Sequence, residues 1–258
     1  VDEGTAIVSK DGANAWCLDI PAGTTLYGPG TLKMAAGQSG TVRGLRVAAA
    51  RVSVADITID MNKANQSVNE QDHAVIVSAD DFSADRVKIS NCPGDGILLW
   101  NSSRHRIDAC KITACDRNGI TLYADGTGTL ADVVIANSHI EAAVQPIDSE
   151  PTETSVITRV RVVGNHLKST TGGYAMTLSG SSVATPASGY TVTGNTMLGS
   201  IYLVDVTDSV VSSNIIDATS SATLNAVEAF AYSRRITLAG NHLTAAAGKH
   251  GVRLAYSL

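Results

Sequence analysis

A short pattern of apolar and polar positions recurs along this chain. Its clearest copies are "RVRVVGNHL", "GYTVTGNTM" and "RITLAGNHL", which end at Leu167, Met197 and Leu243. In each copy apolar residues alternate with other residues and a tight turn follows. An Asn then stands two residues before the next apolar residue. Alternation with a period of two is typical of a β-strand that has one buried face. The pattern therefore predicts short strands joined by a corner that repeats along the chain.

Looser copies extend the pattern toward the N-terminus. The position of the Asn is filled, in order, by Ile57, Cys92, Cys110, Ser138, Asn165, Asn195, Asn214 and Asn241. A second alternating strand lies between successive copies, as in "DGILLW", "NGITLY" and "YAMTLS". Strands that recur with one corner chemistry are typical of a solenoid with parallel stacked coils. We therefore predict an all-β fold, a right-handed parallel β-helix of about eight to nine coils that spans residues 1–258 as a single domain.

Stacking gives the asparagines a structural role. Like residues of successive coils lie above one another, so the four C-terminal asparagines should form a hydrogen-bonded ladder along the axis. A sharp corner also needs a residue in the left-handed conformation, which Asn tolerates well, and we expect the asparagines to supply it. The chain stops within a repeat, at "HGVRLAYSL". We expect either a fragment of a longer chain or a rod that a partner completes.

Composition narrows the classes of function. Of the 258 residues, 44% are hydrophobic and 17% are charged, which argues against disorder. The net charge of −5, without large clusters of Lys and Arg, argues against a nucleic-acid partner. No apolar run approaches the roughly 20 residues of a membrane span, so we expect no membrane insertion. The four cysteines lack Cys-x-x-Cys spacing and the histidines beside the ladder suit a structural role, so we expect free thiols, no metal and no cofactor.

Two N-terminal segments resemble a known superfamily. The segments "IPAGTTLYGPGTLKM" (20–34) and "VADITIDMNKANQS" (54–67) are similar to the first coils of the pectate-lyase-like superfamily, particularly its branch of phage tailspikes and other polysaccharide-degrading proteins. "HAVIVS", "NCPGDGILLW" and "CDRNGITLY" follow in the order typical of that superfamily. The resemblance implies a right-handed parallel β-helix, a polysaccharide partner, a homotrimer, and a secreted or virion-associated location.

One departure from the superfamily concerns chemistry. Its alginate epimerases and lyases carry a catalytic Asp and His on one strand, and the resemblance places these positions on Leu98 and Trp100. Neither side chain can transfer a proton in that role, so the same reaction is disfavoured at this strand.

The outward side chains of the second strands should line a long shallow groove that suits an extended glycan. We predict one outward column of Leu98, Thr121, Gln145, Thr177, Tyr202, Glu228 and Arg253. The column beside it should contain Trp100, Tyr123, Ile147, Ser179 and Val204. Aromatic rings are natural platforms for the C–H faces of sugars, so Trp100 and Tyr123 are candidate substrate-binding residues, with Gln145 and Tyr202 beside them. The alternative is that the two rings pack beneath a loop or against a neighbouring subunit.

Carboxylates gather just beyond these strands. Asp125 follows Tyr123, and Asp148 and Glu150 lie in "IDSEPTE". Glycoside hydrolysis needs two facing carboxylates, one of them protonated, so these three are our candidate catalytic residues. The alternative is a solvated acidic loop. Asp95, Asp116 and Asn118 stand at strand starts or before Gly, and we expect them to form turns rather than a site.

Basic residues offer a different chemistry. Lys63 lies in the long insertion at 60–72, His73 stands at its exit, and Arg104 comes further along the chain. They could bind an acidic polymer and activate it for elimination, as a lyase requires.

The sequence thus predicts a glycoside hydrolase of the tailspike kind that acts on a bacterial surface or extracellular polysaccharide. Two alternatives stay open, a glycan-binding or adhesive rod without activity, and a lyase that acts on an acidic glycan.

Overall fold

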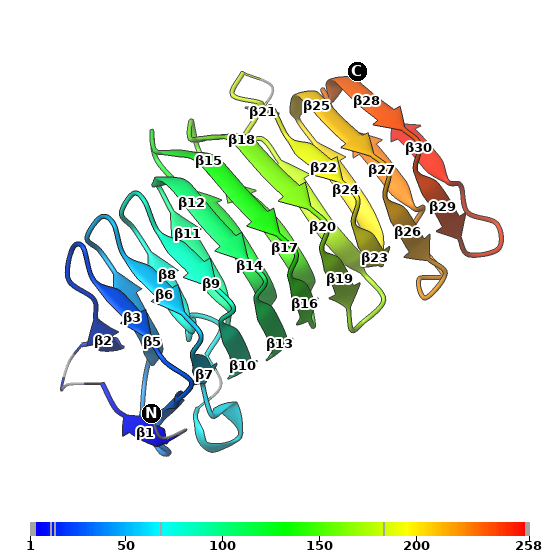
Figure 1. Cartoon of the computed structure of the whole chain (residues 1–258). Coiled ribbons are helices and arrows are strands. Elements are labelled where there is room, and N and C mark those ends of the chain that lie inside the picture. Colours follow the sequence, from blue (N-terminus) through cyan, green and yellow to red (C-terminus); the bar gives the residue numbers. More distant parts are fainter. Residues whose placement is uncertain (1–3, 11, 13, 68, 183, 256–258) are drawn as a thin grey trace.

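The computed structural model of the chain describes residues 4–10, 12, 14–67, 69–182 and 184–255. Its strands form a rod of stacked coils, with β1 at one end and β30 at the other (Figure 1). Three sheets of ten strands run along the rod, and the strand pairs are parallel throughout the described residues. The strand order gives nine complete coils and the first two strands of a tenth. This confirms the predicted parallel β-helix.

Each coil contributes one strand to each sheet, and only one coil of the third sheet is split. The strands of the first sheet are β1 (Thr5–Val8), β4 (Thr31–Met34), β7 (Thr58–Asp60), β10 (Lys88–Cys92), β13 (Lys111–Cys115), β16 (His139–Ala142), β19 (His166–Ser169), β23 (Thr196–Leu198), β26 (Ile215–Ala218) and β29 (His242–Ala245). Those of the second sheet are β2 (Trp16–Asp19), β5 (Arg43–Val47), β8 (Val75–Val77), β11 (Ile97–Trp100), β14 (Asn118–Ala124), β17 (Gln145–Pro151), β20 (Tyr174–Ser179), β24 (Ser200–Val204), β27 (Val227–Phe230) and β30 (Val252–Ala255). Those of the third sheet are β3 (Thr25–Tyr27), β6 (Ser53–Ala55), β9 (Ser83–Asp85), β12 (Ser103–Asp108), β15 (Thr129–Ala136), β18 (Val156–Val163), β21 (Ala187–Ser188), β22 (Thr191–Thr193), β25 (Val206–Ser212) and β28 (Arg234–Ala239). A single 3-10 turn, η1 (Lys63–Asn65), follows β7 in the described part of the chain.

The core fills the inside of the coils with aliphatic side chains. Ile97 and Leu99 on β11, and Ile120 and Leu122 on β14, have no exposed surface. This confirms the predicted inward phase of these strands. Burial of such a side chain stabilises the fold by about 1.5–3 kcal/mol, and stacking repeats the gain in every coil.

The asparagine ladder lies at the corner between the third and first sheets. The Oδ1 of Asn195 accepts hydrogen bonds from the backbone N–H of Asn165 at 2.9 Å and from its Nδ2 at 3.0 Å. Asn214 accepts from Asn195, and Asn241 accepts from Asn214, in the same two ways. Ser138 continues the ladder by donating its backbone N–H to Asn165. The predicted ladder is therefore confirmed.

Two details of the corner differ from the prediction. The left-handed residue precedes the Asn, as at Gly164 with φ 68° and Gly194 with φ 67°. The chain turns there, and the asparagine that follows is free to point its amide along the axis. Cys92 is also not a ladder position, because it pairs with Cys115, and Val87 occupies the place below Cys110. Val87 stands three residues after Ala84, and Cys92 stands three residues after Ile89, so both fit the repeated spacing. The spacing alone could not choose between them.

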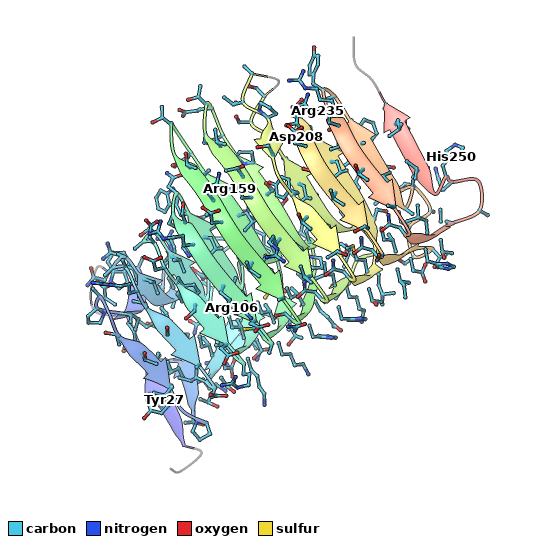
Figure 2. All side chains as sticks on the ribbon, turned by 45° about the horizontal axis from the view of Figure 1, so that its top comes forward. Tyr27, Arg106, Arg159, Asp208, Arg235 and His250 are labelled. Atoms are coloured by element: carbon cyan, nitrogen blue, oxygen red, sulfur yellow. The ribbon has the colours of Figure 1, made fainter. Side chains whose placement is uncertain are left out.

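A second stack of exposed residues lies in the first half of the strands of the third sheet. Arg159 pairs with Asp132 at 2.6 Å, and Arg235 pairs with Asp208 at 2.5 Å (Figure 2). All four residues have φ between 51° and 57°. Their side chains are about half exposed, and ion pairs of this kind add little stability.

Candidate functional site

The register of the second sheet decides which side chains share its outer face. Thr121 on β14 lies beside Leu98 on one side and beside Asp148 on the other. Asp148 therefore occupies the outward column, and the predicted placement of Gln145 there is wrong. Ile147 points inward with no exposed surface, so its predicted place in the neighbouring column is also wrong. Side chains alternate along a strand, so a shift of three residues exchanges the two faces.

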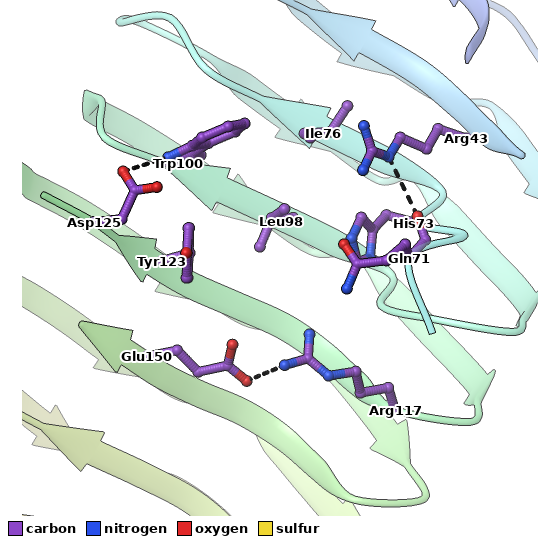
Figure 3. Close-up of a pocket in the computed structure, with 10 residues that line it drawn as sticks. All are labelled: Arg43, Gln71, His73, Ile76, Leu98, Trp100, Arg117, Tyr123, Asp125 and Glu150. Carbon is purple, nitrogen blue, oxygen red and sulfur yellow. Dashed lines mark hydrogen bonds and ion pairs between the residues drawn. The ribbon is translucent and has the colours of Figure 1, made fainter. Parts of the chain in front are cut away.

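Tyr123 lies in register between Trp100 and Glu150 in the neighbouring outward column. The two rings meet edge to face, with centroids 6.0 Å apart. The Oδ1 of Asp125 accepts hydrogen bonds from Trp100 Nε1 at 3.0 Å and from Asn101 Nδ2 at 2.6 Å. Burial, followed by the charges of Asp125 and Glu150, raises the pKa of the Tyr123 phenol. The two carboxylates therefore lie near this ring and at different ends of one aromatic wall (Figure 3).

A polar network continues from Glu150 into the protein. Asn118 Nδ2 is a donor within 3.2 Å of Asp148 Oδ2 and 3.3 Å of Glu150 Oε1. Arg117 Nη2 donates to Glu150, and its Nη1 donates to Asp95 Oδ2 at 2.9 Å. Asp95 has no exposed surface, and its Oδ1 accepts the backbone N–H of Asn118 at 3.1 Å. The structure thus brings Asp148 and Glu150 together and joins them to residues of two other coils.

Electrostatics separates the protonation states of these acids. Burial, followed by a hydrogen bond and charge repulsion from Glu150, raises the pKa of Asp148 to about 8. The raised pKa favours the protonated form of Asp148 at neutral pH, and Asn118 Nδ2 lies within hydrogen-bond distance of both carboxyl groups. Burial likewise raises the pKa of Asp95, to about 6, although Arg117 opposes this shift. The neighbouring carboxylates raise the pKa of Arg117 despite its burial.

One residue at the start of each strand of the second sheet forms a further stack, which we call the corner column. Its members in six successive coils are Trp16, Arg43, His73, Asp95, Asn118 and Gln145. His73 Nδ1 accepts the backbone N–H of Asp95 at 3.2 Å, which places the proton of the neutral ring on Nε2. Burial, followed by the charges of Arg43 and Arg117, lowers the pKa of His73 to about 3. His73 is therefore a neutral hydrogen-bond donor at this site.

These groups surround a cavity of about 270 Å³ on the outer face of the second sheet (Figure 3). Its lining residues are Arg43, Gln71, His73, Ile76, Leu98, Trp100, Arg117, Tyr123, Asp125 and Glu150. Five of our candidates therefore line it, namely His73, Trp100, Tyr123, Asp125 and Glu150. Asp148 lies behind Glu150 and is 8% exposed. Ring stacking, hydrogen bonding and proton transfer can all take place within this one cavity.

The remaining candidates lie elsewhere. Lys63 Nζ pairs with Asp116 at 2.5 Å next to the first sheet, and Arg104 pairs with Asp81 at 2.6 Å at the edge of the third sheet. Neither lines the cavity. Tyr202 lies on the outer face of the second sheet and stacks on Tyr174 at 4.9 Å, but beyond the cavity. Gln145 belongs to the corner column and does not line the cavity either.

Sequence reasoning missed several residues of the site. We expected Asp95 and Asn118 to form turns, and we assigned no role to Arg43, Gln71 or Arg117. The signal that could have found them is positional. Asp95-Gly96 and Asn118-Gly119 occupy the same position of the repeat in two consecutive coils. Residues at one position of a solenoid repeat are neighbours in space, so two polar residues there predict a contact.

Two wider features complete the description of the molecule. Within the described ranges, no three His, Cys, Asp or Glu side chains are arranged to hold a metal ion. None of the helical structure that is described has the length and apolar character needed to cross a membrane.

Comparisons with known proteins identify the fold. The A-module of the mannuronan C-5 epimerase AlgE4 from Azotobacter vinelandii superposes with a TM-score of 0.63 at 14% identity, over 98% of this chain and 87% of that one. The surface protein and adhesin PfbA of Streptococcus pneumoniae gives 0.62 at 13% identity, over 99% and 82% of the two chains. A polygalacturonase from Erwinia carotovora ssp. carotovora gives 0.51 at 13%, over 96% and 76%. No curated protein matches the sequence. The family model described as "Right handed beta helix region" matches residues 40–197, more than half of the sequence, and the chain therefore belongs to the right-handed β-helix family.

Proposed function

We propose that this protein is a glycoside hydrolase that binds an extended polysaccharide along the outer face of the second sheet. The observation that carries the proposal is the pair Asp148 and Glu150, a buried acid and a carboxylate of an aromatic cavity that both lie within hydrogen-bond distance of Asn118 Nδ2. Two solved structures with this fold are named for enzymes of polysaccharides, an epimerase and a polygalacturonase.

Hydrolysis of a glycosidic bond requires a proton for the leaving oxygen. Glu150 lines the cavity and is the group that would deliver this proton. Asp148, behind it, holds a proton at neutral pH because burial and Glu150 raise its pKa. Asp148 would pass this proton to Glu150, which Arg117 keeps in position, and Glu150 would pass it on to the leaving oxygen.

The second carboxylate must act at the anomeric carbon, away from the acid. Asp125 lines the same cavity beyond the Tyr123 ring, and Trp100 and Asn101 orient it by hydrogen bonds. It would stabilise the positive charge that develops on the sugar and activate the attacking group. Trp100 and Tyr123 supply apolar surface for the sugar face between the two acids.

The test is an assay for new reducing ends on a panel of bacterial capsular, lipopolysaccharide and extracellular polysaccharides. Glu150→Gln should lower kcat/KM on the polymer that is cleaved by about 10²–10⁴-fold, because it removes the proton donor. Asp125→Asn should lower kcat/KM by a factor of the same order. Glu141→Gln is the matched control, because Glu141 lies on β16 of the first sheet and pairs with His139. Full activity of Glu150→Gln would contradict the assignment.

A second candidate function is glycan binding without cleavage. Leu98 occupies the outward column beside Thr121, and Asp148 is nearly closed off from solvent. One of the solved structures with this fold is named as an adhesin. Binding to the panel without new reducing ends would favour this function over hydrolysis. Products with a new ultraviolet absorbance would instead show elimination and identify a lyase.

The location and assembly of the protein are part of the same proposal. A polysaccharide at a bacterial surface places the protein outside the cell or on a virion, and we propose a homotrimer in solution. Light scattering of the purified chain measures the mass directly, and a monomeric mass would reject the trimer.

A further inference from the structure

A second cavity adjoins the candidate active site on the same face. It has a volume of about 140 Å³ and is lined by Trp16, Arg43, Arg46, Ile76, Ser78 and Trp100. Arg43, Ile76 and Trp100 also line the first cavity. The two hollows therefore follow one another along the rod, from β2 to β17. Six strands about 4.8 Å apart cover roughly 24 Å, enough for several sugar residues in an extended chain.

The second cavity contains a guanidinium that the protein itself does not neutralise. Arg43 is half-buried, and its side chain donates only one hydrogen bond within the described residues, from Nε to the Gln71 carbonyl at 3.3 Å. No carboxylate in that part of the chain forms an ion pair with it. Burial lowers the pKa of Arg43, and the charge of Asp72 opposes this shift. A guanidinium has five N–H donors, so most of those on Arg43 are available to a ligand.

Arg46 adds a second positive charge to the same wall. Its guanidinium lies over the Trp16 ring, 4.1 Å from the centroid, and its Nη1 contacts Asp19 Oδ2 at 3.2 Å. Asp19 is half exposed, so this ion pair is solvated and weak. Arg117 in the first cavity differs, because Asp95 and Glu150 already engage both ends of its guanidinium.

We propose that the second cavity binds a carboxylate-bearing sugar residue, with its carboxylate on Arg43 and Arg46 and its ring against the indoles of Trp16 and Trp100. Arginine forks match the geometry of a carboxylate, and aromatic rings bind the C–H face of a sugar. The exposed Ser78 hydroxyl is available to a ring hydroxyl. The inference rests on the proposed function only in that the same polymer continues into the first cavity, and it makes that polymer an acidic polysaccharide.

The test measures binding in the Glu150→Gln background, which separates affinity from cleavage. Three probes are compared. They are oligouronates, the same oligosaccharides after reduction of their carboxyl groups to alcohols, and oligosaccharides that carry sulfate esters but no carboxyl groups. Isothermal titration calorimetry should show that the oligouronates bind most tightly and that added salt weakens their binding. Arg43→Gln should weaken oligouronate binding by at least about tenfold and leave the reduced probe unaffected. Arg43→Lys keeps the charge without the guanidinium fork, and its affinity for oligouronates should lie between those of its parent and of Arg43→Gln.

Arg106→Gln is the matched control, because Arg106 lies on the third sheet, is exposed, and pairs with Asp108 (Figure 2). It should bind like its parent, and thermal unfolding of all variants checks that they fold. Equal affinity for the reduced probe, tighter binding of the sulfated probe, no oligouronate binding, or an unaffected Arg43→Gln would each overturn the proposal. If the oligouronates bind through Arg43 but the native protein cuts no polymer, the proposed hydrolase fails and this site stands. If a neutral polymer is cut and Arg43→Gln has no effect, the hydrolase stands and this site fails.

Discussion

Two stacks of polar residues run along this rod, and they use the same repetition for different ends. The asparagine ladder places one residue type in four successive coils, and the amide oxygens of Asn195, Asn214 and Asn241 each accept two hydrogen bonds from the coil below. The amide nitrogens also donate to backbone carbonyls, as from Asn165 to Ile135 at 2.9 Å. The ladder is therefore satisfied within itself and has no capacity left for a ligand.

The corner column places a different residue type in almost every coil. His73 and Asp95 each accept the backbone N–H of the next member of the column, but other contacts reach sideways, as from Asn118 to Asp148 and Glu150. Buried oxygens of Asn118 and Gln145 have no hydrogen-bond partner among the described residues. Repetition in a solenoid therefore stabilises the rod, and variation at a repeated position supplies chemical groups for a site.

The largest effect on stability should come from breaking the ladder. Asn195→Ala removes the acceptor of two Asn165 groups, so the buried backbone N–H of Asn165 loses its partner and its Nδ2 keeps only the hydrogen bond to the Ile135 carbonyl. We expect the free energy of unfolding to fall by about 3 kcal/mol, measured by urea denaturation. A loss no larger than that of Gln145→Ala would show that the two stacks do not differ in this respect.

Replacing the buried acid of the site should have a smaller effect of the opposite sign. The folded pKa of Asp148 is raised to about 8, so between about pH 4 and 8 the folded protein binds a proton that the unfolded chain has released. The native protein therefore loses stability as the pH rises through this window, and Asp148→Asn does not. We expect Asp148→Asn to match the native protein near pH 4 and to become the more stable of the two as the pH rises toward 8.5.

The control for this pH dependence is Asp132→Asn. The hydrogen bond from Arg159 lowers the pKa of Asp132, so its stabilising effect is present above the ordinary pKa and is lost as the pH falls. The difference between this variant and the native protein should therefore have the reverse sign. A gain in Asp148→Asn that does not depend on pH would contradict the raised pKa of Asp148.

The smallest effect should come from Gln145→Ala. Gln145 is half-buried in the corner column, and its side chain makes no hydrogen bond with any described residue. We expect the free energy of unfolding to change by no more than about 0.5 kcal/mol in the same urea titration. A loss that approaches the loss for Asn195→Ala would mean that the corner column is a structural ladder as well.

The coil, the inward phase of its clearest strands and the asparagine ladder follow from the amino-acid pattern alone. These features depend on strict alternation and on residues such as Asn195 that repeat at one position, so each coil repeats the signal of the last. The neighbouring positions of Trp100 and Tyr123 follow from the same phase, because "DGILLW" and "NGITLY" align without ambiguity. That part of the candidate site could be predicted.

The register of β17 and the contacts of the corner column emerge only in the folded chain. The segment "QPIDSEP" has a single large aliphatic residue, Ile147, so its alternation does not define which face is buried. The contacts of Arg117 with Asp95 and Glu150 join residues 22 and 33 positions apart, across three coils. Such contacts depend on how far each long side chain reaches across the sheet and on how strongly burial desolvates its charge. A local pattern does not contain either quantity, and both exist only once the coils are stacked.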